Sequence, residues 1–141
     1  MRRSLKLFIK EAWSTIEPNR FYNDNWHIDA ISDHLQAIVN GDIKRLIINI
    51  PPRHMKSISV SVALPAWTWT IDPTKKFLFA SYALSLSIRD SVKCRRLIES
   101  DWYKEYFGGT FSLTTDQNQK QRFENDQTGQ RIATSVDGAL T

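Results

Sequence analysis

Apolar residues recur at intervals of three and four near the start of the chain. Six of them would share one helix face, which Pro18 would end: Leu5, Phe8, Ile9, Ala12, Trp13 and Ile16. The polar and aromatic stretch RFYNDNWH, at residues 20–27, predicts a loop. A second helix is predicted to follow and to stop at Asn40 and Gly41, with an apolar face of Ile28, Ile31, Leu35 and Ile38.

Two short runs are almost entirely apolar, RLIINI at residues 45–50 and KFLFASY at residues 76–82. Such runs are typical of parallel strands that are buried on both faces. The stretch between them alternates as a strand would, but two parallel strands need a long crossover, which is usually helical. We therefore predict a helix that begins near Lys56, kinks at Pro65 and ends at Asp72 and Pro73.

The last part of the chain predicts one more helix and a hairpin. Over residues 84–100, Leu84, Ile88 and Val92 form an apolar stripe, and a basic stripe lies next to it: Arg89, Lys93 and Arg96. Further on, RFEND and QRIATSV would pair as a hairpin around Gln127, Thr128 and Gly129. Helices alternating with apolar strands indicate an α/β fold.

Composition and charge narrow the class of protein. Hydrophobic residues make up 41% of the 141 residues, which is typical of a folded domain. The basic opening MRRSLKLFIKEAWS is interrupted by Lys6, Lys10 and Glu11, so we expect no export signal and a cytoplasmic protein. The single cysteine, Cys94, excludes an internal disulfide.

Positive charge is concentrated in the middle of the chain. Residues 51–96 carry eight Lys and Arg against two acids, whereas residues 97–141 carry four against seven. Such a distribution suits phosphate or nucleic acid, but from charge alone a solvated basic face is the more ordinary reason for it.

The stretch INIPPRHMKS, at residues 48–57, places Lys56 and Ser57 between a predicted strand and a predicted helix. This is the layout of a P-loop, whose lysine reaches the β- and γ-phosphates and whose serine binds Mg²⁺. The usual pattern, G-x-x-x-x-G-K-[ST], has glycines where this chain has Ile50 and Met55. From the pattern alone, an ordinary proline turn remains an alternative.

The segment LIINIPPRHMKS resembles the Walker A segment of the large terminase subunit of tailed bacteriophages, in which the loop typically reads Pro-Pro-Arg-His-Gly-Lys-Ser. The similarity extends to the segments on both sides, such as PAWTWTIDPTKKFLFASYALSLSIRDSVKCRRLIESDWY, and covers residues 13–141. It implies the first part of a RecA-like P-loop NTPase core, with parallel strands and flanking helices. Residues 1–44 would be a helical lead-in, residues 45–100 the P-loop unit and residues 101–141 the hairpin region.

The resemblance also implies ligands and roles. ATP phosphates would be held by the loop residues His54, Met55, Lys56 and Ser57, and Mg²⁺ by the hydroxyl of Ser57. Arg53 matches a loop arginine thought to act on the γ-phosphate, although a plain salt bridge is the alternative. Met55 departs from the family's glycine and would restrict the approach of backbone to phosphate.

Two further regions could contact ligands. Trp26 and His27 match the region where terminases often bind adenine, although Trp26 could instead be a hydrophobic staple for the second helix. Arg89, Lys93, Arg95 and Arg96 could follow the phosphates of double-stranded phage DNA, or be a solvated face. The family also implies a small terminase subunit and a portal protein as partners, in the cytoplasm of a bacterial host.

ATP hydrolysis needs a Walker B acid after an apolar strand and an acid that orients water. No run of four apolar residues precedes an acid after Tyr82, and the carboxylate-rich nuclease domain of terminases has no counterpart among these residues. The sequence therefore predicts the ATP-binding, N-terminal piece of a packaging motor that drives DNA translocation. The alternative is an inactive prophage remnant that keeps at most phosphate or DNA binding. A helicase-like P-loop protein is disfavoured by the Pro-Pro-Arg loop.

Overall fold

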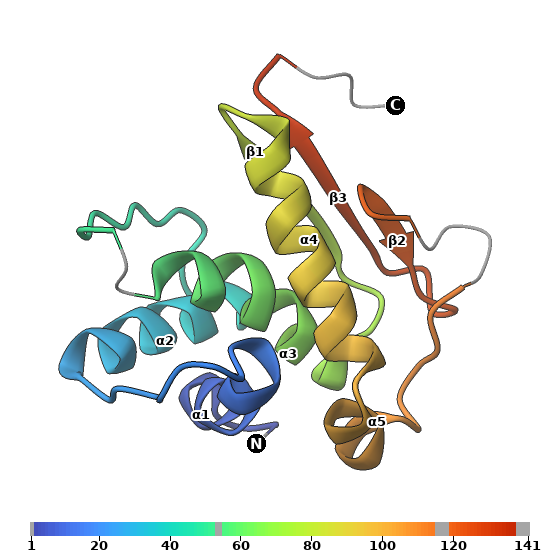
Figure 1. Ribbon diagram of the computed structural model, residues 1–141, viewed down its shortest axis with the longest axis horizontal. Coiled ribbons are helices and arrows are strands. Elements are labelled where there is room, and N and C mark those ends of the chain that lie inside the picture. Colours follow the sequence, from blue (N-terminus) through green and yellow to red (C-terminus); the bar gives the residue numbers. More distant parts are fainter. Residues whose placement is uncertain (1, 53–54, 115–118, 138–141) are drawn as a thin grey trace.

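A computed structural model of the chain describes residues 2–52, 55–114 and 119–137 (Figure 1). It is an α/β structure in which helices gather beside a small mixed sheet. The elements, in chain order, are α1 (Leu5–Ile16), α2 (Trp26–Val39), the π-helix η1 (Ile58–Ala63), α3 (Leu64–Ile71), β1 (Lys76–Ser81), α4 (Leu84–Glu99), α5 (Asp101–Phe107), β2 (Arg122–Glu124) and β3 (Gln130–Ser135).

The sheet has three strands in the order β1-β3-β2. β2 and β3 are antiparallel, which confirms the predicted hairpin, and Thr128 in their connection has a positive φ of 72°. β1 is parallel to β3, with Leu78 opposite Ile132. Gly129 is required next to this pair because a Cβ there would lie 2.1 Å from the carbonyl oxygen of Pro73.

The prediction that residues 45–50 form a strand parallel to residues 76–82 is wrong. The segment has no strand partner among the described residues, and in Figure 1 it (teal) runs apart from the sheet. Alternate residues pack partly against the core, whereas Ile47 is 85% exposed. A branched apolar run favours an extended backbone, but a strand also needs a neighbour to bond with.

Residues 76–81 do form a strand, but the prediction of burial on both faces is wrong. Exposed and half-buried residues alternate along β1, and Leu78 is 55% exposed. Phe77 and Phe79 face α4 and the core, and the guanidinium of Arg131 lies over the Phe79 ring at 4.3 Å. Helix α4 packs across this covered face of the sheet (Figure 1).

The helical crossover between residues 56 and 72 is confirmed. Its first helical residue is Lys56, and the helix is wound as a π-helix over η1 before α3 continues it in the α form. Pro65 explains the change of winding, because a proline ring clashes with the carbonyl four residues earlier, here that of Ser61. The predicted kink is therefore a local widening of the helix. Nearly every residue of α3 is buried, including Trp67 and Trp69.

Helices α1 and α4 lie where the periodicity predicts them, but the buried face of α4 differs from the predicted one. α1 buries the predicted face, and Ser4 caps it by accepting from the N–H of Leu7 at 3.2 Å. α4 has the predicted bounds to within a residue, but its buried face is Ser87, Ser91, Cys94, Leu97 and Ile98. The predicted apolar stripe of α4 lies at the edge of that face and is only partly covered. α5 was not predicted, because its seven residues are too few to show a periodicity.

The helices were compared with the length and apolar character of membrane-spanning helices. None of the helices formed by the described residues combines the length and the apolar character that crossing a bilayer requires.

Candidate functional site

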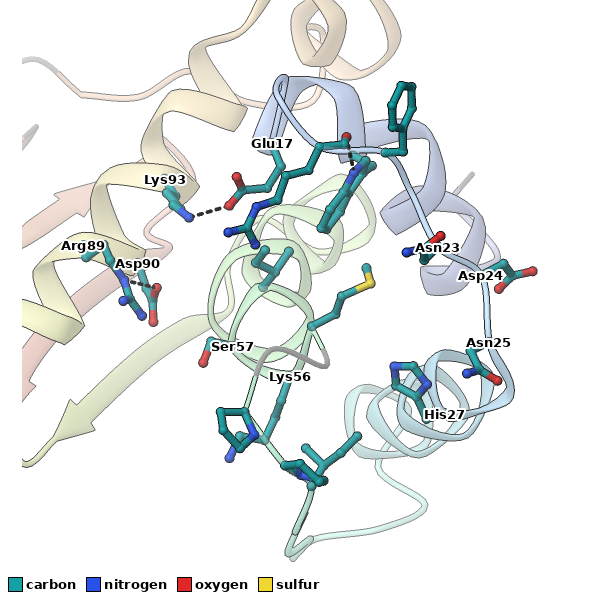
Figure 2. A pocket seen from close by; sticks show the side chains of 18 residues that line it. Glu17, Asn23, Asp24, Asn25, His27, Lys56, Ser57, Arg89, Asp90 and Lys93 are labelled. Atoms are coloured by element: carbon teal, nitrogen blue, oxygen red, sulfur yellow. Dashed lines mark hydrogen bonds and ion pairs between the residues drawn. The ribbon is translucent and has the colours of Figure 1, made fainter.

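A large cleft of about 960 Å³ opens between the helices (Figure 2). Its walls come from the end of α1 and the loop after it, the start of α2, the segment before Lys56, and α4. The remaining wall is the first turn of the helix that runs from Lys56 through η1 and α3, called the central helix below. A volume of this size can hold a ligand as large as a nucleoside triphosphate. The site residues that line it are Trp13, Glu17, Arg20, Asn25, His27, Met55, Lys56, Ser57, Arg89, Asp90 and Lys93.

The central helix begins inside this cleft, at Lys56 and Ser57. The N–H of Ser59 donates to the carbonyl of Met55 at 2.9 Å, which starts the helical hydrogen bonding. The first N–H groups of a helix have no partner within the helix, so a helix start is a place that attracts anions. Lys56 and Ser57 thus supply a cation and a hydroxyl where the helix itself favours negative charge.

Met55 has a φ of 67°, in the left-handed region that glycine adopts freely. Met55 therefore takes a backbone conformation that a glycine would adopt without strain. The Met55 side chain also lines the cleft and packs partly against the core. The predicted site residues Arg53 and His54 lie outside the described residues.

Helix α4 adds charge to the opposite wall of the cleft. Lys93 forms an ion pair of 2.6 Å with Glu17, and Arg89 contacts Asp90 through Nε at 3.4 Å (Figure 2). Arg96, the third member of the predicted basic stripe, is exposed but does not line the cleft. The structure therefore separates the stripe, with two cations in the cleft and the third outside it.

The loop after α1 is tied back to α1, and α1 is also paired with α2. Trp13 Nε1 donates to the carbonyl of Arg20 at 2.9 Å, and the Lys6 ammonium pairs with both Asp24 and Asp29. The hydrogen bond to Asp29 is the main reason that the pKa of Lys6 is raised. These contacts join the loop, whose residues line the cleft, to α1.

A second, smaller cavity of about 450 Å³ adjoins the first and shares His27, Asn25, Ile50 and Pro51 with it. Its lining is mostly apolar and includes Trp26 and Ile48. Trp26 is the first residue of α2 and is 76% exposed, so it is not a staple packed against the helix. The predicted loop thus ends at Asn25, and Trp26 and His27 belong to α2.

No group of three or more His, Cys, Asp or Glu side chains in the described part of the chain is arranged to hold a metal ion. Mg²⁺, however, is usually bound by few protein oxygens together with phosphates and water. The Ser57 hydroxyl and the carboxylate of Asp90 are oxygen donors that line the same cleft. Two oxygen donors therefore line the cleft, which is the kind of ligand that Mg²⁺ prefers.

A layer of buried polar groups lies between α4, η1 and the sheet. Arg131 has no exposed surface and donates through Nη2 to the carbonyl of Ser61 at 2.7 Å. Burial raises the pKa of the Cys94 thiol from 9.0 to about 11 and lowers the pKa of Arg131. Cys94 is thus protonated at neutral pH and is not poised as a nucleophile.

Sequence reasoning missed the acids of the cleft. Glu17 and Lys93 lie 76 positions apart, and no local pattern connects them. Asp90 carried a weak signal, because it is one of only two acids among residues 51–96 and directly follows Arg89. Comparisons of the chain with protein-family models, with curated proteins and with solved structures found no match.

Proposed function

We propose that the chain binds ATP with Mg²⁺ in the cleft, with the phosphates at Lys56 and Ser57. The observation that carries this proposal is the start of a helix in a cleft of about 960 Å³, with a left-handed residue directly before a Lys-Ser pair. This combination provides free amides, a positive helix end, a cation and a hydroxyl at one place.

Each residue then has a distinct role. Lys56 neutralises the β- and γ-phosphates, and Ser57 ligates Mg²⁺ through its hydroxyl. The loop residues His54 and Met55 help to shape the phosphate site, and Arg53 acts on the γ-phosphate. When bound, Mg²⁺ would neutralise phosphate charge, with the carboxylate of Asp90 as a further oxygen donor in the cleft.

The base of the nucleotide belongs at the α2 end of the cleft. His27 lines both cavities, and Trp26 exposes most of its indole ring beside the smaller one. An aromatic face next to an apolar cavity suits the stacking of adenine. The lining of Ile48 and Ile50 would shield the base from water.

The wider function rests on the resemblance of the sequence. We propose that ATP binding here serves the DNA-packaging motor of a tailed phage, a RecA-like P-loop NTPase, in the cytoplasm of the host cell. Double-stranded DNA, a small terminase subunit and a portal protein would be its partners, and the exposed Arg96 would contact DNA phosphates. The alternative is a catalytically inactive remnant that binds nucleotide or DNA without coupling the two.

The direct test is a titration with a fluorescent ATP analogue and Mg²⁺, on the parent chain, on Lys56→Ala and on Lys10→Ala. Lys10 is exposed on α1 outside the cleft and serves as the matched control. Losing one charged contact costs about 1.5–3 kcal/mol, so Lys56→Ala should bind roughly ten- to a hundredfold more weakly. Equal binding by all three proteins would exclude the phosphate role of Lys56.

A phosphate-release assay on the same proteins separates binding from catalysis. After Tyr82 no run of four apolar residues precedes an acid, as a Walker B strand would require, so we expect no release above background. Release that disappears in Lys56→Ala would show that the chain hydrolyses ATP after all.

A further inference from the structure

Helix α4 brings two cations into the cleft, Arg89 and Lys93, and they differ in their exposure and in how tightly each is paired with an acid. This difference indicates which of them is available to bind a phosphate. We propose that Arg89 binds the γ-phosphate of the nucleotide, whereas Lys93 holds α1 and α4 together. This inference rests on the proposed nucleotide binding. It assigns to Arg89 a ligand other than DNA, which the basic stripe had suggested.

The position of Arg89 relative to the phosphate site is the first argument. In Figure 2, Arg89 and Asp90 lie at the end of the cleft near Ser57, whereas His27 and Asn25 lie at the other end. Lys56 lies between the two ends. A nucleotide with its base near His27 and its β-phosphate at Lys56 would therefore extend its last phosphate toward Arg89.

The availability of each cation is the second argument. Lys93 and Glu17 are 2.6 Å apart and their side chains are only 33% and 20% exposed, so this pair is well shielded from solvent. The Arg89 side chain is 55% exposed, and its contact with the neighbouring Asp90 is long, at 3.4 Å, and uses only Nε. Exposed pairs of this kind are weak, so Arg89 can turn to an incoming anion at little cost.

The geometry of the guanidinium is the third argument. Because Asp90 contacts Nε, the terminal nitrogens of Arg89 make no hydrogen bond within the part of the chain that the structure describes. A guanidinium can bind two phosphate oxygens at once through such nitrogens. The contact with Asp90 thus does not occupy the donors that a phosphate needs.

Asp90 is itself supported from the core side. Its carboxylate is 15% exposed, and its negative charge favours the charged form of the buried Arg131. Asp90 therefore interacts with one arginine in the core and one in the cleft.

The test compares nucleotides that differ by one phosphate. Fluorescent analogues of ATP and ADP, each with Mg²⁺, are titrated into the parent chain, Arg89→Ala, Lys56→Ala and Arg3→Ala. Arg3 is exposed near the N-terminus outside the cleft and is the matched arginine control. Circular dichroism spectra that match the parent chain confirm that each variant is folded.

We expect Arg89→Ala to weaken binding of the ATP analogue by about tenfold, the effect of one lost charged contact, while ADP binding changes less than about twofold. Lys56→Ala should weaken both nucleotides. If Arg89→Ala leaves ATP binding unchanged, or weakens ATP and ADP equally, the γ-phosphate assignment is wrong. If Lys56→Ala also has no effect, the proposed function itself fails, so the two failures can be told apart.

Binding of duplex DNA at low salt provides the remaining comparison. A loss of DNA affinity in Arg89→Ala, with ATP affinity unchanged, would overturn the assignment and return Arg89 to the DNA-contacting stripe. Unchanged DNA affinity together with a selective loss of ATP affinity would support the assignment.

Discussion

Met55 has a backbone conformation typical of glycine, but its side chain occupies space in the cleft. Its φ of 67° is costly for a residue with a Cβ, by about 1–2 kcal/mol, and is free for glycine. The side chain meanwhile lines the cleft beside Lys56. A glycine would retain the backbone path and open space for a phosphate to approach the amides.

We expect Met55→Gly to bind the ATP analogue several-fold more tightly than the parent chain. Relief of backbone strain should roughly offset the lost apolar contacts and the added flexibility, so the free energy of unfolding should change by less than about 1 kcal/mol. Titration and denaturant unfolding measure the two effects. Met55→Ala is the control, because it shortens the side chain but keeps the Cβ. Weaker binding in Met55→Gly would contradict the glycine-like role of this position.

At the scale of elements, a hydrogen bond from Arg131 on β3 joins the central helix to the sheet. The carbonyl of Ser61, in the π-helical stretch, cannot accept from residue 65 as it would in an α-helix, because residue 65 is a proline. Arg131, on β3, donates to this carbonyl at 2.7 Å. Its Nε and Nη1 are buried without a hydrogen-bond partner among the described residues, which makes this a costly way to satisfy one carbonyl.

A double-mutant cycle tests whether the hydrogen bond from Arg131 to the Ser61 carbonyl stabilises the protein. Pro65→Ala provides a backbone N–H for Ser61, so it should help the protein more when Arg131 is replaced by methionine than when Arg131 is present. We expect a coupling of about 1 kcal/mol in the free energy of unfolding, measured by denaturant titration of the parent, both single variants and the double variant. Additive effects, within about 0.3 kcal/mol, would show that Arg131 does not replace the missing donor.

For the whole molecule, the arrangement of layers leaves one side of the sheet open. α4 and the aromatic core cover the face that carries Phe77, Phe79 and Arg131. The opposite face carries Leu78, which is 55% exposed, with Ile132 paired beside it. β1 is also an edge strand, because it pairs only with β3 among the described strands. An apolar open face next to an unpaired edge favours association with other chains.

We therefore expect the chain to self-associate as its concentration rises, and Leu78→Lys to reduce this association. Lysine at an exposed strand position repels a second copy and tolerates the same backbone. Sedimentation velocity over a range of concentrations measures the effect. Leu7→Lys, at an exposed apolar position on α1 away from the sheet, is the matched control. Equal association of the two variants would show that the open face is not the contact.

The sequence by itself determined the elements that depend on neighbours along the chain. The faces of α1 and α2, the bounds of α4 and the turn at Gln127 to Gly129 follow from periodicity, caps and turn residues. The helix start at Lys56 and Ser57 was predicted for a different reason, since the local pattern there alternates as in a strand and only the need for a long crossover indicated a helix.

Only the tertiary structure decided which segments meet. Residues 45–50 have the composition of a buried strand, yet β1 pairs with β3, more than fifty positions later. The pairing of Glu17 with Lys93, the cleft that Arg89 shares with Lys56 and Ser57, and the burial of Arg131 likewise join distant parts of the chain. Periodicity reports which face of an element is apolar, but the choice among possible partners depends on how all the faces pack together at once.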